Sequence, residues 1–299
     1  MKICVIGAAN LDLISYVPRL PQVGETLHGS RFQMGYGGKG ANQAVMAAKL
    51  GAEVAMVCKL GRDVFGEGTL ENFHAHGIDT THVTFTEEAF SGVAPIAVDR
   101  KGQNAIIIVT GANDVLSLDD LERARPMIAG SDIVVCQLEI PVELTLAALR
   151  IAREEGARTI FNPAPARPDL PEELYRLSDV ICANEPETEL LTEMQAGEEA
   201  ARALLGRGTR TVVLTLGERG CLVVEQDTAT AVPVEAVNAV DTSGAGDAFV
   251  GSLAVFLAAG RLPAEAAARA NRVAALSVQG RGTQSSFPNR TDLPVDLLG

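Results

Sequence analysis

The chain has 299 residues, enough for one large domain or two modest ones, and 47% of them are hydrophobic, which predicts a sizeable core. Aromatic residues make up only 4% and tryptophan is absent, so aliphatic side chains must build that core. The net charge of −13 argues against nucleic acid and anionic membrane surfaces as partners, and any phosphate site must work against it.

Short β-branched runs alternate with amphipathic stretches along the chain. Several of these runs are continuously apolar, such as 133–135 and 212–214, which fits a sheet covered on both faces. The predicted strands are 2–7, 54–60, 92–99, 104–109, 132–138, 158–162, 179–183, 211–216 and 220–225. The predicted helices are 41–50, 66–76, 118–128, 142–155, 185–193, 197–206, 246–259 and 263–278. This order predicts an α/β fold with a largely parallel central sheet and helices on both faces.

Two segments break this alternation. Residues 11–38 are rich in glycine and proline and show no helical pattern, and residues 90–110 are typical of a hairpin around the turn 99–102. Together they are expected to form a small β layer, placed to act as a lid over the strand ends where α/β proteins bind ligands. Because no internal repeat or low-complexity linker is present, we expect residues 1–299 to form a single domain with this lid.

The cysteines lie in or beside predicted strands, where cysteine acts as a small hydrophobic residue. They are Cys4, Cys58, Cys136, Cys182 and Cys221. Their spacing matches neither a C-x-x-C pair nor a metal site, which favours a reducing, cytoplasmic location. We find no signal peptide before the first predicted strand and no apolar run of membrane-spanning length.

The most informative motif is the segment 241–249, a glycine-rich turn directly before a predicted helix. The first N–H groups of a helix have no intrahelical partner and its dipole makes that end positive, so the turn is a candidate anion site. Gly244 and Gly246 leave room for close approach of a ligand. Asp247 places a carboxylate beside this site, where it could accept a hydroxyl proton.

An anion site next to a general base is what phosphoryl transfer to an alcohol requires. The ordinary alternative is a packing turn whose aspartate only interacts with the helix dipole. The oxygen-bearing side chains of residues 241–243, more than a helix cap requires, weigh against that alternative.

A second glycine-rich motif, residues 35–40, contains a literal G-x-G-x-x-G. The dinucleotide-binding interpretation fails on context, because that fingerprint should follow the first strand directly and here roughly thirty residues intervene. It is not a Walker A loop either, since Lys39 lies too early and no Ser or Thr follows it. What remains is a flexible loop before a helix, with Lys39 and Asn42 placed to bind sugar hydroxyls. The ordinary alternative is a packing turn with an exposed lysine, against which the neighbouring glycines argue.

Polar residues also follow other predicted strands, at the edge where α/β sheets bind ligands. Asn10 and Asp12 follow the first strand, and Asp12 could hold two vicinal hydroxyls or close an Asx turn. Glu139 is a further acid at a strand end. Asn184 and Glu187 could orient magnesium-bound waters, or form an ordinary helix cap with an acid in the first turn.

Two weaker signals lie further along the chain. Thr215 and Gly217 end a predicted strand, where small residues leave space for a flat ring such as adenine. The segment 280–283 offers backbone carbonyls that, with Asp241 and Ser243, could enclose a monovalent cation next to the anion site. The spacing alone does not establish such a cation site.

Taken together, these motifs show that the chain resembles the ribokinase-like (PfkB) family of carbohydrate kinases over essentially its whole length. The resemblance is carried by segments 37–45, 162–166, 184–187, 215–217 and 241–249, and by the residue pairs 10 with 12 and 137 with 139. It implies a three-layer α/β sandwich with a β-sheet lid that pairs across a homodimer. It also implies ATP-dependent phosphorylation of D-ribose at O5, with Mg²⁺ and K⁺ as cofactors.

The resemblance further implies roles for individual residues. Asp247 would be the base, and the N–H groups of Gly244, Ala245 and Gly246 would hold the γ-phosphoryl charge. The implied sugar ligands are Asn10, Asp12, Gly38, Lys39, Asn42, Glu139 and Asp247. The implied nucleotide ligands are Asn184, Thr215, Gly217, Gly246 and Asn271, although some relatives have a histidine in place of Asn271. The implied metal ligands are Glu187 for Mg²⁺ through water, and Asp241, Ser243, Ser277, Gly280, Gly282 and Ser286 for K⁺.

Three alternatives stay open at this point. The first is a kinase for another small sugar or a nucleoside, such as deoxyribose, fructose or an adenosine-like compound. The second is a nicotinamide-dependent oxidoreductase that uses the embedded G-x-G-x-x-G. The third is a catalytically dead sugar sensor, against which the intact glycine turn and Asp247 argue.

Overall fold

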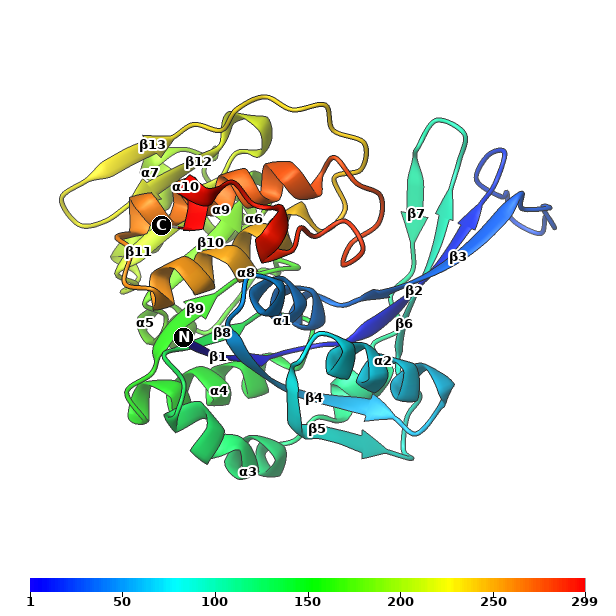
Figure 1. Cartoon of the computed structure of the whole chain (residues 1–299), viewed down its shortest axis with the longest axis horizontal. Helices are drawn as coiled ribbons and strands as arrows, with labels where there is room; N and C mark the ends of the chain where they lie inside the picture. The colour runs from blue at the N-terminus through cyan, green and yellow to red at the C-terminus, as the bar shows by residue number, and fades with distance from the viewer. Residues whose placement is uncertain (299) are drawn as a thin grey trace.

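The computed structural model describes residues 1–298, and its largest element is a nine-stranded sheet with the order β13-β12-β11-β10-β9-β8-β1-β4-β5 (Figure 1). The strands are β1 (Lys2–Ile6), β4 (Glu53–Gly61), β5 (Asp79–Thr86), β8 (Ile133–Cys136), β9 (Arg158–Phe161), β10 (Val180–Asn184), β11 (Thr211–Thr215), β12 (Cys221–Val224) and β13 (Ala229–Val232). Only the pairs β11–β12 and β12–β13 are antiparallel; all other neighbours in this sheet are parallel.

Helices cover both faces of this sheet, because its strands are apolar on both sides. In β1, Ile3 and Val5 enter the core on one face, while Cys4 and Ile6 enter the core on the other. The first face packs against α1 (Lys39–Lys49), α2 (Val64–Ala75), α8 (Ala245–Ala258), α9 (Pro263–Ser277) and α10 (Val295–Leu298). The second packs against α3 (Leu118–Ala129), α4 (Val142–Glu154), α5 (Glu172–Leu177), α6 (Glu185–Thr192) and α7 (Glu198–Gly206). Short 3₁₀ turns lie at 111–115, 217–219 and 290–292.

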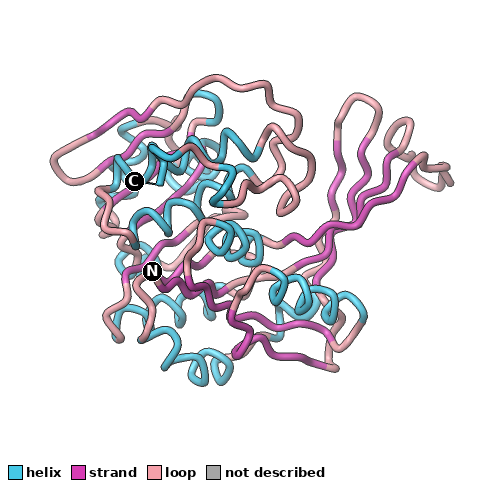
Figure 2. Tube along the Cα trace, in the orientation of Figure 1, coloured by secondary structure: helices cyan, strands magenta, loops and turns pink. Residues whose placement is uncertain are grey.

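A smaller sheet projects from this body, and its outer end extends beyond the helices (Figures 1 and 2). Its strands are β2 (Asn10–Tyr16), β3 (Arg31–Gly37), β6 (Gly92–Val98) and β7 (Asn104–Ile106), in the order β3-β2-β6-β7. The two segments that broke the alternation in the sequence therefore meet in one sheet, because β2 pairs with β6 in parallel over the full length of both strands.

The structure confirms the predicted fold class and corrects several elements. The predicted strand 104–109 ends at Ile106, after which the Ile107 N–H still donates to the Pro95 carbonyl. Four elements were not predicted from the sequence: β5, β13, α5 and the four-residue helix α10. Strand β5 lies at a sheet edge, begins with four polar residues and has only two apolar ones, Val83 and Phe85, while β13 is four residues long and α5 is six, so none shows a long hydrophobic period.

The five cysteines are buried thiols without disulfide bonds, as their apolar settings predicted. Within residues 1–298, none of the helices has both the length and the apolar character that a membrane span requires.

The fold brings the glycine-rich motifs to the carboxyl ends of the parallel strands, the usual ligand edge of such a sheet. Gly38 caps α1 with a φ of +85°, and a Cβ there would lie 2.7 Å from the Asn10 nitrogen. Only glycine therefore allows β3 to turn into α1 against the link between β1 and β2. The G-x-G-x-x-G belongs to this junction, and its strand lies in the smaller sheet rather than in a βαβ unit of the main sheet.

Candidate active site

Asp247 lies in the first turn of α8 and is only 7% exposed. Its Oδ1 accepts a hydrogen bond from Gln43 Nε2 at 2.9 Å, and its Oδ2 accepts one from Asn42 Nδ2, also at 2.9 Å. Both donors come from α1, which packs so closely on α8 that a Cβ on Gly251 would lie 2.6 Å from the Gln43 carbonyl oxygen. The carboxylate is therefore held in one orientation by two buried amides.

The amide network continues on both sides of Asp247. Gln43 Nε2 also lies 3.1 Å from Asn162 Oδ1, and Asn162 Nδ2 donates to the Cys182 carbonyl at 2.8 Å. On the other side, Gln284 Nε2 donates to Asn42 Oδ1 at 2.9 Å. These contacts link the ends of β9 and β10 to the loop after α9 through the carboxylate of Asp247.

The turn before α8 has the features of an anion site. Gly244 has a φ of +74°, and a Cβ there would clash with Thr283, so the turn requires glycine. A Cβ on Gly246 would meet open space. Within the part of the chain that the structure describes, the N–H groups of Gly244, Gly246 and Asp247 have no hydrogen-bond partner. Free amides at a helix N-terminus attract an anion.

One of the predicted amide donors differs from the others. The Ala245 N–H donates to the Thr242 carbonyl at 3.2 Å, so the turn itself uses this donor. Of the three predicted amides, those of Gly244 and Gly246 are therefore ready to bind an anion, whereas that of Ala245 is engaged within the turn.

A cavity of about 580 Å³ lies between the smaller sheet and the main body, directly in front of Asp247. Its lining includes all the predicted sugar ligands: Asn10, Asp12, Gly38, Lys39, Asn42, Glu139 and Asp247. The smaller sheet adds apolar side chains, among them Ile14 and Ile96. The cavity thus combines a polar floor with an apolar wall, as small-molecule sites commonly do.

The polar groups of this cavity are held by neighbours on other elements. The Lys39 N–H donates to Glu139 Oε2 at 2.8 Å. Asn10 is oriented by Asn113, whose Nδ2 donates to Asn10 Oδ1 at 2.8 Å. By contrast, the Asp12 carboxylate has no hydrogen-bond partner within residues 1–298, although the backbone of Asp12 pairs within β2. An unpartnered carboxylate facing a cavity is suited to a ligand that supplies hydroxyl donors.

Carboxylates dominate the electrostatics of the cavity. Burial, together with the charges of Glu139 and Asp247, raises the pKa of Asp12 to about 6. Burial also raises the pKa of Glu139, against the opposing effect of Lys39. Burial lowers the pKa of Lys39, but the charges of Asp247, Glu139 and Glu187 outweigh it and the net pKa is raised. Lys39 therefore stays protonated, among carboxylates whose charges repel one another.

Asn184 and Glu187 form a capping box at the start of α6. The Glu187 N–H donates to Asn184 Oδ1, and the Asn184 N–H donates to the Glu187 carboxylate, each at 2.9 Å. Glu187 is nevertheless part of the site's electrostatics: burial raises its pKa, the Asn184 N–H and Lys39 lower it, and Asp247 raises it. Glu187 can therefore cap α6 and still act electrostatically on the site.

The other predicted nucleotide ligands lie outside the 580 Å³ cavity. Thr215 ends β11, where its hydroxyl lies 3.4 Å from the Ala183 carbonyl oxygen, and Gly217 begins the 3₁₀ turn that follows. Asn271 is buried in α9, and its Nδ2 donates to the Val232 carbonyl at 3.0 Å. The Asn271 amide is therefore committed to the link between α9 and β13 in this structure.

The predicted cation ligands come together where two loops meet. Asp241 Oδ1 accepts from the Ser243 N–H and its Oδ2 accepts from the Gly282 N–H, each at 2.9 Å. A Cβ on Gly280 would lie 2.9 Å from the Ser286 Cβ, so this loop folds back on itself. Ser277 ends α9 just before it. Across residues 1–298, no group of three or more His, Cys, Asp or Glu side chains could hold a metal, so a cation here would depend on carbonyl and hydroxyl oxygens.

Three residues that shape this site were not predicted from the sequence: Gln43, Asn113 and Gln284. Gln43 could have been found, because it is a polar residue on an otherwise apolar helix, next to Asn42. Asn113 and Gln284 lie in a 3₁₀ turn and a loop without a sequence pattern.

Comparisons with known proteins agree with this geometry. The family model described as "pfkB family carbohydrate kinase" matches residues 1–290. The chain is 46% identical over 305 aligned residues to a ribokinase of Mus musculus, covering 99% of this chain and 94% of the mouse protein. It is 42% identical over 294 residues to a deoxyribokinase of Salmonella typhi, covering 97% and 96%. Its fold matches the structure of Arabidopsis thaliana ribokinase complexed with ribose and ATP with a TM-score of 0.91 and 31% identity, covering 99% and 98%.

Proposed function

We propose that this chain, which belongs to the pfkB family of carbohydrate kinases, transfers the γ-phosphoryl group of ATP to O5 of D-ribose. The products are ribose 5-phosphate and ADP. The observation that carries the proposal is the position of the Asp247 carboxylate, between a polar cavity of sugar size and the unpartnered amides at the start of α8.

In the proposed reaction, Asp247 accepts the proton of the ribose O5 hydroxyl while O5 attacks the γ-phosphorus and ADP leaves. Asn42 and Gln43 each donate to a different carboxylate oxygen, and each oxygen can accept one further hydrogen bond from O5. The amides of Gly244 and Gly246 stabilise the negative charge on the migrating group. Preorganised donors of this kind act where charge develops in the transition state.

The sugar is held by the polar floor of the cavity. Asp12 and Glu139 accept hydroxyl protons, and Lys39, Asn10 and Asn42 donate to hydroxyl oxygens. The Asp12 carboxylate accepts no hydrogen bond from the protein, and the hydroxyls of a bound sugar would supply such donors. This supports its assignment to a pair of vicinal hydroxyls. Gly38 allows the close approach of the sugar to the start of α1.

We assign the nucleotide to the surface next to this cavity, along the residues that end β10 and β11. The proposed contacts are Asn184, Thr215, Gly217, Gly246 and Asn271. Mg²⁺ would be held by the phosphates and by waters on Glu187, and would neutralise phosphate charge. K⁺ would be held between the two loops by Asp241, Ser243, Ser277, Gly280, Gly282 and Ser286, and would add positive charge beside the anion site.

The smaller sheet is proposed to act as the lid of the sugar cavity and as the surface of a homodimer. Its side chains Phe32 and Met34 are 59% and 57% exposed, and Ile106 is 51% exposed. Exposed apolar residues on a projecting sheet support pairing with a second copy. The buried free thiols support the assignment to a reducing cytoplasm.

A coupled ADP-release assay over ribose, deoxyribose, fructose and adenosine, run in K⁺ and in Na⁺, tests the function. We expect ribose to give the highest kcat/KM and K⁺ to raise the rate. A higher kcat/KM for deoxyribose would assign the chain to the activity of its Salmonella relative instead. Release of no ADP with any of these acceptors would contradict kinase activity and favour a sugar sensor.

Replacement of Gln43 by leucine tests how the base is positioned. The variant loses the donor to Asp247 Oδ1, and hydrogen bonds to charged groups contribute about 1.5–3 kcal/mol, so we expect kcat to fall about tenfold or more. KM for ribose should change less, because Gln43 does not line the cavity. Thr209→Val, which removes a buried hydroxyl donor before the amino end of β11, at the other end of the strand from the candidate site, is the matched control. An unchanged kcat in Gln43→Leu, or an equal loss in the control, would show that this contact does not position the base.

A further inference from the structure

A second cavity, of about 590 Å³, lies at the other end of the parallel strands from the candidate active site. It is formed at the amino ends of β9, β10 and β11, with contributions from the end of α4 and the link between α8 and α9. Its volume is in the range typical of small-molecule sites. None of the motifs used above falls in this cavity.

The charge of this cavity is opposite to that of the chain. Four arginines line it, Arg153, Arg158, Arg210 and Arg261, against two acids, Asp179 and Glu225. Arg261 also pairs with Glu265 outside the lining at 3.4 Å, which leaves a local excess of one positive charge. The chain as a whole has 38 acidic and 25 basic residues. A concave surface with such an excess concentrates anions, even on an acidic protein.

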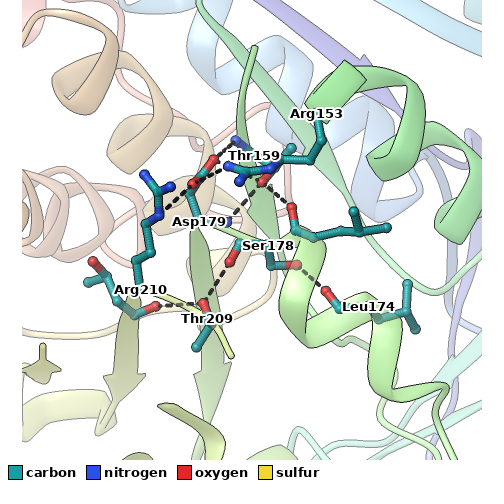
Figure 3. Close-up of polar contacts among 9 residues, drawn as sticks. Arg153, Thr159, Leu174, Ser178, Asp179, Thr209 and Arg210 are labelled. Carbon is teal, nitrogen blue, oxygen red and sulfur yellow. Dashed lines mark hydrogen bonds and ion pairs between the residues drawn. The ribbon is translucent and has the colours of Figure 1, made fainter. Parts of the chain in front are cut away.

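The Asp179 carboxylate is already fully engaged within the protein (Figure 3). Arg153 Nη1 lies 2.6 Å from its Oδ1, and Arg210 Nε lies 3.5 Å from the same oxygen, so the two guanidinium groups reach it from different elements. Its Oδ2 accepts from the Thr159 N–H at 2.9 Å. Asp179 is 7% exposed and cannot neutralise further cations.

Arg158 takes no part in these contacts with Asp179. It is the first residue of β9 and is partly buried, yet its guanidinium makes no hydrogen bond or ion pair within residues 1–298. A guanidinium that lines a cavity without a protein partner is available to bind an anion. Its planar fork is suited to the paired oxygens of a phosphate group.

We propose that this cavity binds a phosphorylated small molecule, at a site separate from the kinase centre. Arg158 and Arg210 contact its phosphate groups, while Arg153 stays on Asp179 and fixes the floor of the site. A single phosphate group, which carries a charge of about −1.5 to −2 at pH 7, is enough to offset the positive charge of the cavity. The site is independent of the proposed kinase reaction, because none of its residues lines the sugar cavity.

Isothermal titration calorimetry of the full chain with sodium tripolyphosphate, at low salt and without Mg²⁺, tests the proposal. We expect the wild type to bind at this cavity, and the double variant Arg158→Ser/Arg210→Ser to bind there about 100-fold more weakly, roughly tenfold for each charge-assisted contact. Tripolyphosphate bound at the α8 turn should be unaffected and serves as an internal reference. Replacement of Arg158 breaks no ion pair, and replacement of Arg210 removes only its 3.5 Å contact with Asp179, which keeps Arg153 and the Thr159 N–H as partners. Unchanged ADP release with ribose verifies the fold of the double variant.

The matched control is Arg202→Ser, which removes an arginine on α7 that pairs with Glu198 outside the cavity. Identical isotherms for the wild type and the double variant, or the same loss in Arg202→Ser, would overturn the proposal. Citrate is the second probe, because it carries several negative charges on carboxylates alone. Tighter binding of citrate than of tripolyphosphate at the cavity would overturn the assignment to phosphate groups.

Discussion

Replacing Asp247 by asparagine is expected to lower kcat about 10²–10⁴-fold, the usual contribution of a general base, while the chain stays folded and still binds ribose. The substitution keeps the size of the side chain in its buried position but removes its ability to take a proton. Kinetics of ADP release and direct measurement of the ribose Kd separate these two effects.

The asparagine variant also disturbs one contact of the native carboxylate. Asn42 and Gln43 both donate to Asp247, and an asparagine amide can accept from only one of them, so a loss of about 1 kcal/mol in the free energy of unfolding is expected. Ser252→Ala, which removes a fully buried hydroxyl from the same helix without touching the site, controls for such a loss. Turnover near the wild-type rate in Asp247→Asn would rule out this residue as the base.

Replacing Asp12 by asparagine is expected to change stability and sugar binding in opposite directions. The native carboxylate is half-buried and unpartnered near Glu139 and Asp247, so its charge destabilises the folded chain. It is also the proposed acceptor for two hydroxyls, and its loss should weaken ribose binding about 10- to 100-fold. Equilibrium unfolding in urea and ribose titration measure the two effects.

The pH dependence of the stability effect follows from the raised pKa of Asp12. Below about pH 3 the carboxyl is mostly protonated in both the folded and the unfolded chain, so the substitution should not change stability there. As the pH rises from the ordinary pKa of 3.8 to about 6, only the unfolded chain readily loses the proton, and the wild type loses stability. Above pH 6 the variant should be more stable by about 2–3 kcal/mol.

Glu87→Gln is the matched control for this experiment, because Glu87 is 83% exposed and lies outside the cavity. It should alter neither the stability difference between pH 8 and pH 4 nor the affinity for ribose. A variant Asp12→Asn that is no more stable than the wild type at pH 8 would show that the carboxylate is not under electrostatic strain. Unchanged affinity for ribose would remove Asp12 from the sugar site.

The main features of the fold could be predicted from the sequence because they depend on local patterns. Continuous apolar runs such as β8 predict a sheet covered on both faces, and the glycine turn before α8 predicts an open helix N-terminus. Strand β5 could not be predicted in the same way, because an edge strand with one neighbour does not need a continuous apolar run.

The details of the site were less predictable, because they depend on contacts between distant segments. Gln43 meets Asp247 across 204 positions of sequence, and Gln284 meets Asn42 across 242, so no local spacing indicates either contact. Asn271 was placed along the nucleotide by resemblance, but its amide bonds the Val232 carbonyl in the folded chain. Asn184 and Glu187 show the reverse case, since their capping box was predictable from spacing alone.

A crystal structure with ribose and a non-hydrolysable ATP analogue would test most directly whether Asp247 and the α8 turn perform the transfer together. The proposed mechanism predicts that O5 of ribose lies within about 2.6–3.2 Å of the Asp247 carboxylate, with the terminal phosphate facing the amides of Gly244 and Gly246. A terminal phosphate bound away from this turn, with no path that would bring it to O5 beside Asp247, would contradict the mechanism.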